Sequence, residues 1–142
     1  MTSNPSTIIL QQAQTVVDAC LRRAAELELK MNVAVVDAGA NLKAFGRMDD
    51  AWLGSVDISI KKARTARYFD MPTGDLSPMV QPGESLYHLE FSNGGLITFP
   101  GGIPLQLDDG TVIGAVGVSG STVDNDQTVA EAGVAAFEST QK

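Results

Sequence analysis

A single histidine, His88, lies in the turn-rich segment 82-PGESLYHLEF-91. Its imidazole can ligate iron or act as a general acid or base near neutral pH. Tyr87, Glu84 and Glu90 lie close enough in sequence to orient or assist it. The alternative is a surface or partly packed histidine with no chemical role. Because transition-metal sites use more ligands at defined spacing than one histidine and its neighbouring carboxylates, the sequence predicts no metal centre.

Lys62, in 61-KKARTA-66, is the second candidate. The spacing of apolar residues predicts a helix over 52–70, whose main apolar face comprises Trp52, Val56, Ser59, Ile60, Ala63 and Ala66. Lys62 falls between this face and a smaller apolar group, so desolvation should lower its pKa unless an acid pairs with it. It can bind a propionate or another carboxylate, or form a salt bridge across a subunit interface. Asp57 and Lys61, four residues apart, are predicted to form a solvated ion pair.

Two further polar candidates flank a predicted hairpin. Asp37 opens the turn 37-DAGAN-41, where an aspartate commonly accepts hydrogen bonds from the amides of its own turn; the alternative is a catalytic acid. Arg47 follows the second strand, and its guanidinium can grip an anionic ligand or pair with Asp49 or Asp50 at the rim.

The stretch 100-PGGIPLQLDDGTVIGAVGVSGS-121 contains closely spaced glycines but no phosphate-loop or dinucleotide-binding pattern. Glycine inside a strand marks a bulge or the close approach of a helix, a second subunit or a flat ligand. We therefore predict an open β surface that a ligand can touch directly. Gly101 and Gly102 would lie against such a ligand and present their amides to it, or else form a tight turn into Ile103 and Pro104.

The elements that must position these residues follow from apolar periodicity and turn signals. Helices are predicted over 6–30 (capped by Ser6 or Thr7), 52–70 and 124–139 (capped by Asp124 or Asn125), with short helical turns near 75–80 and 84–89. Strands are predicted over 31–37, 42–48, 96–99, 103–107 and 111–120. Hairpins predominate over crossovers, so the fold class is α+β, with a mainly antiparallel sheet of about five strands covered by helices.

Composition narrows the function classes. The 142 residues suit one domain, 1–142, and the net charge of −7 disfavours nucleic acid and anionic membranes as partners. The single cysteine, Cys20, excludes a disulfide framework and is expected to be a small buried residue. The N-terminus has no signal-peptide pattern and no stretch is apolar enough to span a membrane, so we expect a cytoplasmic protein.

Four motifs in order, 32-NVAVVDAGANLKAFGRMD-49, 61-KKARTA-66, 100-PGGIPLQLDDGTVIGAVGVSG-120 and 124-DNDQTVAEAG-133, resemble the GlcG/HbpS family of small α+β proteins. The resemblance implies an antiparallel sheet with helices on it and a homo-oligomer, often a hexamer or octamer. It also implies binding of haem, haem degradation or action near corrinoid chemistry. Lys62 matches the lysine of the family's KAxTA pattern. PduO-type members would place an axial histidine in the first helix, whereas residues 6–30 here contain none.

Two hypotheses about function follow. In the first, the protein binds a tetrapyrrole, haem or a corrinoid, with Lys62 and Arg47 meeting carboxylates and either His88 or a non-histidine residue near the metal. In the second, it is a cofactor-independent lyase, isomerase or hydrolase acting on a small metabolite. Lys62, His88, Tyr87 and an acid, Asp37 or Glu90, would then share acid–base catalysis. An accessory oligomer without chemistry is a third alternative.

Overall fold

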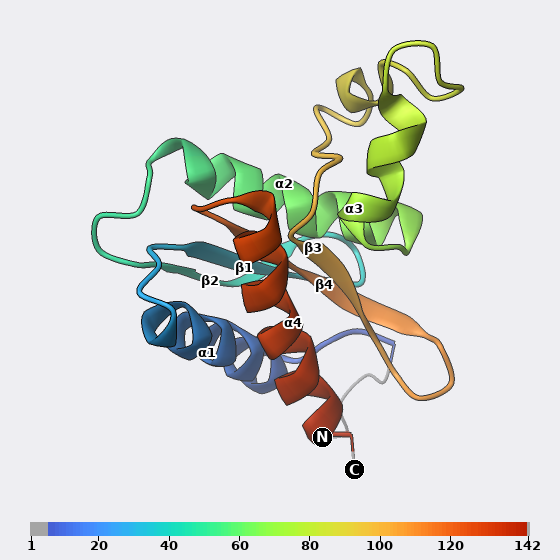
Figure 1. Cartoon of the computed structure of the whole chain (residues 1–142). Coiled ribbons are helices and arrows are strands. Elements are labelled where there is room, and N and C mark those ends of the chain that lie inside the picture. The colour runs from blue at the N-terminus through green and yellow to red at the C-terminus, as the bar shows by residue number, and fades with distance from the viewer. Residues whose placement is uncertain (1–5, 142) are drawn as a thin grey trace.

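The computed structural model describes residues 6–141, which form a four-stranded sheet with helices on both faces (Figure 1). Its elements are α1 (Leu10–Glu26), β1 (Asn32–Asp37), β2 (Leu42–Arg47), α2 (Gly54–Phe69), α3 (Thr73–Leu76), β3 (Gly102–Gln106), β4 (Val112–Ser119) and α4 (Val123–Ser139). Two short 3₁₀ helices, Ser77–Val80 and Leu89–Phe91, lie between α3 and β3. Among these residues, no helix is both long and apolar enough to cross a bilayer.

The sheet is antiparallel throughout, in the order β2-β1-β4-β3. The predicted α+β class and the 31–37/42–48 hairpin are confirmed, but the prediction of about five strands is wrong. Residues 96–99 do not join the sheet; the amide of Ile97 instead donates to the Thr65 hydroxyl of α2 at 3.2 Å.

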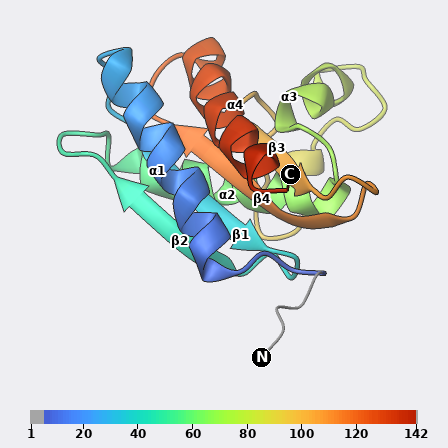
Figure 2. The same cartoon turned by 90° about the horizontal axis from the view of Figure 1, so that it is seen from below.

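Successive side chains of β1 point to opposite faces of the sheet and so enter two separate cores. Val33 and Val35 face α1 and α4 in the larger core, whereas Ala34 and Val36 face α2 in a smaller core built mainly of alanines. Figure 2 shows α1 and α4 side by side in front of the sheet and α2 behind it. Small side chains on the α2 face let this helix lie close to the strands.

Several predicted helix ends differ from those of the structure. Helix α1 begins at Leu10, because the preceding residues are extended: the Ile8 amide donates to the Ile113 carbonyl at 2.9 Å, and the Thr7 hydroxyl accepts from the Ala38 amide at 3.1 Å. Thr122, not Asp124 or Asn125, caps α4 by accepting from the Asn125 amide at 3.1 Å.

The predicted place of Trp52 on the buried face of α2 is also wrong. Helix α2 starts at Gly54, so Trp52 precedes it and is 65% exposed.

Residues 77–96, here called the arm, project beyond one end of the sheet (Figure 1, yellow-green). Helix α3 leads into the arm, and residues 97–101 return from it to β3. The helical turn predicted near 75–80 is confirmed, whereas the one predicted near 84–89 is instead a 3₁₀ turn at Leu89–Phe91. His88, which is on the arm, therefore lies away from the two cores.

Candidate functional site

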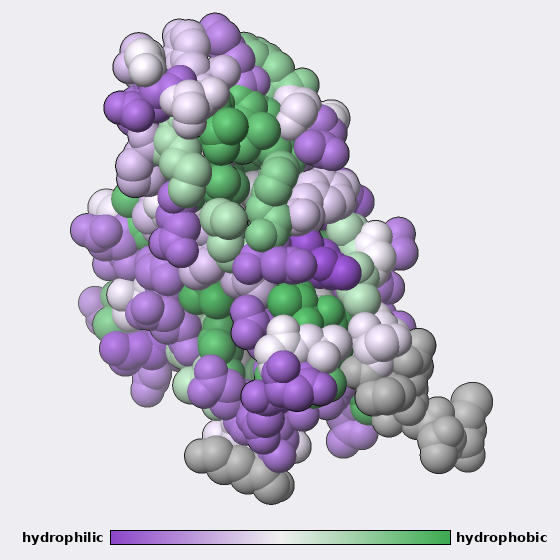
Figure 3. Space-filling model, turned by 90° about the vertical axis from the view of Figure 1, so that its right-hand side faces the viewer, coloured by the Kyte–Doolittle hydropathy of each residue, from purple (hydrophilic) through white to green (hydrophobic). Residues whose placement is uncertain are grey.

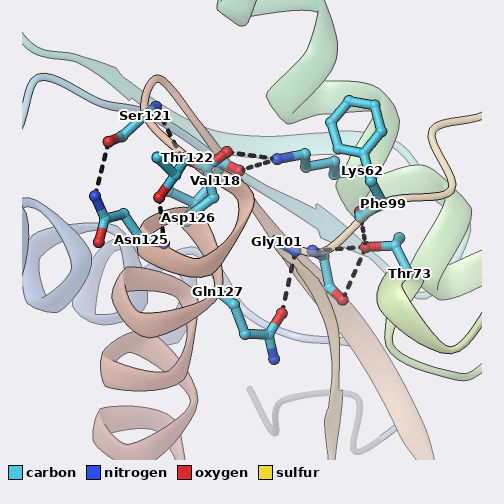
Figure 4. A network of polar contacts seen from close by, with 11 residues as sticks. Lys62, Thr73, Phe99, Gly101, Val118, Ser121, Thr122, Asn125, Asp126 and Gln127 are labelled. Carbon is cyan, nitrogen blue, oxygen red and sulfur yellow. Dashed lines mark hydrogen bonds and ion pairs between the residues drawn. The ribbon is translucent and has the colours of Figure 1, made fainter. Parts of the chain in front are cut away.

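Lys62 is fully buried at the junction of α2, β4 and α4. Its ammonium group donates to the Val118 carbonyl at 2.8 Å and pairs with the Asp126 carboxylate at 2.9 Å (Figure 4). The ring of Phe99 lies over the same nitrogen, with 5.0 Å between Nζ and the ring centroid. The acid that the sequence analysis required for a buried lysine is therefore present, and it comes from the same chain.

Burial has opposite effects on the two partners of this pair. Desolvation lowers the pKa of Lys62 from its usual value, and the attraction of Asp126 opposes that change. Desolvation raises the pKa of Asp126, opposed by Lys62 and by hydrogen bonds from the backbone amides of Ser121 and Gly120. The carboxylate is thus satisfied on both oxygens, since Oδ1 accepts from the Ser121 amide at 3.0 Å. A buried charge pair with these contacts is suited to hold elements together.

Glycines allow α2 to approach the sheet at this junction, so the predicted open β surface is wrong. A Cβ atom on Gly117 would overlap the Ser59 carbonyl and lie 2.5 Å from the Ala63 nitrogen, both in α2. A Cβ atom on Gly101 would lie 2.6 Å from Lys62 Nζ, and one on Gly102 would lie 2.5 Å from the Lys62 carbonyl. The element that approaches these glycines closely is therefore α2 of the same chain, and not a ligand.

His88 lies on the arm in a different setting. Its backbone is in the left-handed region (φ 76°), and its ring centroid is 3.8 Å from that of Tyr87 and 5.2 Å from that of Phe91. Phe91 is 81% exposed. The backbone hydrogen bond from Leu96 to Glu90 closes this part of the arm at 2.9 Å. The result is a surface imidazole that contacts two aromatic rings.

The segment around His88 exposes several large apolar side chains. Large apolar side chains of the arm that reach solvent are Met79, Leu86, Tyr87 and Phe91. Figure 3, which faces the side that bears the arm, shows a hydrophobic patch over its upper part. Below the surface, Oε1 of Glu90 is buried and has no hydrogen-bond partner among the described residues. The arm therefore combines an exposed imidazole, aromatic faces and a carboxyl oxygen with a free hydrogen-bonding position.

The remaining predicted residues lie at opposite ends of the β1–β2 hairpin. Asp37 accepts from the turn amides of Gly39 and Asn41 at 2.9 and 3.0 Å, as the structural alternative predicted. Arg47 lies across from Asn32, and its guanidinium donates to the Ala51 carbonyl at 3.1 Å. No ion pair joins Arg47 to Asp49 or Asp50 in residues 6–141, whereas the predicted pair of Asp57 with Lys61 forms at 3.0 Å.

The predicted residues thus fall into separate groups. Lys62 lies with Gly101 and Gly102 in the buried junction, while His88 lies with Tyr87 and Glu90 on the arm. Asp126 was missed, because it is 64 residues from Lys62 in the sequence. The available signal was its place in the first turn of the helix that follows the glycine-rich strand.

Two open hollows lie elsewhere on the described surface. One, of about 630 Å³, follows α1 and is lined by Leu10, Gln11, Gln14, Thr15 and Asp18. The other, of about 180 Å³, lies between the end of α1 and the β4–α4 turn, where Trp52 and Ser121 contribute to its wall. Neither Lys62 nor His88 lines them.

The part of the chain that the structure describes has no cluster of three or more histidine, cysteine, aspartate and glutamate side chains that could hold a metal ion. Cys20 is buried against α4, and this burial raises the pKa of its thiol to about 12.

Residues 8–135 match the family described as haem degrading protein HbpS-like. A 15.0 kDa uncharacterized protein of the dhaT–dhaS intergenic region in Citrobacter freundii is 42% identical over 133 residues, which are 93% of each chain. The corrinoid adenosyltransferase PduO of Salmonella typhimurium is 36% identical over 136 residues. That alignment covers 95% of this chain but 40% of PduO, so the chain spans less than half the length of that relative.

Solved structures share the whole fold. Protein ORFY of Klebsiella pneumoniae superposes with a TM-score of 0.91 at 39% identity, covering 96% of this chain and 94% of the other. A structure described as a PduOC:heme complex superposes with a TM-score of 0.87 at 37% identity, covering 92% of this chain and 94% of the other.

Proposed function

The chain belongs to the HbpS-like family, and we propose that it binds a tetrapyrrole, either haem or a corrinoid, through the arm that carries His88. The observation that carries this proposal is the likeness of nearly the whole chain to PduOC, which has been solved as a complex with haem. Binding by that relative supports the ligand class for this chain, and the chemistry of the arm supports the place.

The side chains of the arm fit a flat, apolar ring system with a metal at its centre. Tyr87 and Phe91 are both exposed, and both rings contact the only imidazole in the chain. Aromatic and apolar side chains line most small-molecule sites, with few polar groups to fix orientation. Imidazole is a common axial ligand of haem iron. The arm offers both features in one short segment.

Bound haem would supply redox and oxygen chemistry at its iron. In this proposal the chain's own residues have simpler tasks. His88 offers a ring nitrogen, which must be unprotonated to act as a ligand. Tyr87 and Phe91 exclude water from the ring face. The free Oε1 of Glu90 is available to accept a proton or hydrogen bond from a polar group of the ligand.

We assign the buried junction a supporting role. Lys62 is fully buried and its ammonium group already donates to Val118 and Asp126. Helix α2 occupies the space beside Gly101 and Gly102. The loop that follows β2 lies across the molecule from the arm in Figure 1, so Arg47 at the end of β2 would not share a ligand with His88.

Titration with haem and with cobalamin, followed by absorption spectroscopy, tests the proposal. We expect a shifted Soret band with haem at micromolar protein, and an affinity at least about tenfold lower in His88→Ala, since even the outer partners of metal ligands contribute that much. Gln81→Ala, an exposed polar position on the same arm, is the matched control and should bind as the wild type does.

Two results would contradict the proposal in different ways. Absence of any spectral change with both tetrapyrroles would refute the ligand class. Haem binding that is identical in His88→Ala would keep the ligand class and move the site away from the arm, with the hollow along α1 as the next place to examine.

A further inference from the structure

We infer that Thr73 is a positioning residue for the arm: its buried hydroxyl joins the two chain segments at the arm's base, and so determines where His88 is held. The effect on ligand binding rests on the proposed function. The closure of the base does not, because it depends only on contacts within the chain.

Thr73 is the first residue of α3 and is fully buried. Its hydroxyl donates to the Phe99 carbonyl at 2.8 Å and accepts from the Gly102 amide at 3.0 Å (Figure 4). A contact of 3.5 Å to the Gly102 carbonyl is longer, and a hydroxyl has one hydrogen to donate, so Phe99 is its acceptor. One side chain thus satisfies two backbone groups across a separation of 26 to 29 residues.

Glycines bring the two segments into close contact on both sides of this hydroxyl. A Cβ atom on Gly102 would lie 2.7 Å from Thr73 Cγ2, and one on Gly74 would lie 3.0 Å from Pro100 Cγ. The segment that enters the arm therefore packs tightly against the segment that leaves it at two places, Thr73 against Gly102 and Gly74 against Pro100. This close packing leaves little room for the base to shift while the hydroxyl stays bonded.

The leaving segment is also fixed to α2. The Ile97 amide donates to the Thr65 hydroxyl at 3.2 Å, and the Phe99 ring covers Lys62 Nζ. Backbone hydrogen bonds described within 77–96 instead join residues of the arm to one another, such as Leu86 to Met79 at 3.0 Å. Thr73 therefore carries the hydrogen bonds that connect the entering segment to a part of the chain held by the core.

Loss of this hydroxyl should loosen the arm as a unit. Thr73→Val keeps the shape of the side chain but leaves the Gly102 amide and Phe99 carbonyl without their partner. Unpaired buried groups of this kind are destabilising, and we expect the equilibrium constant for local opening of the arm to increase on the order of tenfold. Thr73→Ser restores the hydroxyl and is the conservative variant.

Hydrogen exchange measured by mass spectrometry, together with haem titration, tests the inference. We expect amides of residues 77–101 to exchange about tenfold faster in Thr73→Val than in wild type, with α1 and β1 unchanged. We also expect weaker haem binding and an altered Soret band, and recovery of all three in Thr73→Ser. Thr128→Val is the control, because the described hydrogen bond of the Thr128 hydroxyl is a solvent-exposed one within α4, to the Asp124 carbonyl at 3.0 Å.

The outcomes separate the inference from the proposed function. If the arm exchanges at the same rate in Thr73→Val as in wild type, the inference that the Thr73 hydroxyl closes the base of the arm is wrong. Faster exchange with haem affinity and spectrum unchanged would overturn the positioning role. Faster exchange in a protein whose wild type binds no tetrapyrrole would refute the proposed function and leave the closure standing. If Thr73→Val does not fold, exchange of the Gly102 amide in wild type decides the closure: protection supports it, and exchange at the rate of an exposed loop contradicts it.

Discussion

Lys62 places a positive charge inside the protein, where one carboxylate and one carbonyl take the place of water. Removing a charge from water is costly, and the attraction between buried partners repays this only when their remaining hydrogen-bonding groups are also satisfied. The Asp126 carboxylate meets this condition through the Ser121 amide. Loss of either partner would leave an uncompensated buried charge.

We therefore predict that Lys62→Met lowers the free energy of unfolding by about 3–5 kcal/mol, because it leaves Asp126 buried without its partner. Lys61→Met is the matched control: Lys61 pairs with Asp57 on the exposed side of the same helix, and such pairs contribute about 1 kcal/mol or less. Urea unfolding measures both. The double variant Lys62→Met/Asp126→Asn should recover part of the loss. Equal, small effects of the two single variants would show that the Lys62 pair is not buried in solution.

At this scale the sequence allowed partial prediction. Helical spacing placed Lys62 beside apolar neighbours and required an acid near it, and Asp37 was expected to bond the amides of its own turn. The identity of the acid was not predictable, because periodicity describes local faces while Asp126 reaches Lys62 through the tertiary fold. The site assignments of Lys62 and His88 stay predictions until a ligand is tested.

At the scale of elements, β4 determines how close α2 lies to the sheet. Gly117 of β4 lies directly against α2, where the atoms nearest to its Cβ position are the Ser59 carbonyl and the Ala63 nitrogen. Glycine weakens a strand by itself, and here its smallness permits the close packing of helix on sheet. The packing in turn brings Lys62 within reach of Val118.

Gly117→Ala should therefore destabilise the protein by about 3 kcal/mol or more, since the new methyl group would meet α2 backbone that cannot move independently. Gly54→Ala, at the start of α2, is the matched control: nothing lies within 4 Å of its Cβ position, and alanine favours helix by up to about 1 kcal/mol. Thermal unfolding should show a large decrease for the first variant and no decrease for the second. A stable Gly117→Ala would mean that α2 stands further from β4 than described.

Most elements were predictable, because α1, α2, α4 and the β1–β2 hairpin have clear periods and turn residues. Two errors have one physical origin. Residues 96–99 are apolar like a strand, but their position next to α2 gives Ile97 a side-chain acceptor instead of a neighbouring strand. The glycine-rich strand was taken as open because nothing local indicates which element will cover it.

At the scale of the whole molecule, the junction and the arm have different tasks. The junction is buried and its polar groups are satisfied, which is typical of structure that must not move. The arm exposes large apolar side chains and is bonded mainly to itself, which is typical of segments that contact a ligand or partner. Thr73 and Phe99 lie between the junction and the arm, so a shift of the junction can affect the position of the arm.

Apolar exposure beyond the arm bears on assembly, which stays a prediction for this chain. Trp52 and Leu53, the two residues just before α2, are 65% and 77% exposed, and paired apolar side chains of this size favour burial against another protein surface. We expect a homo-oligomer, a hexamer or octamer of the 14.9 kDa chain, in native mass spectrometry at micromolar concentration. Leu53→Glu should shift the distribution to smaller species, while Glu131→Gln, on the exposed side of α4, should not. A wild-type protein that is wholly monomeric under these conditions would contradict the prediction, and would require Trp52 and Leu53 to remain in water.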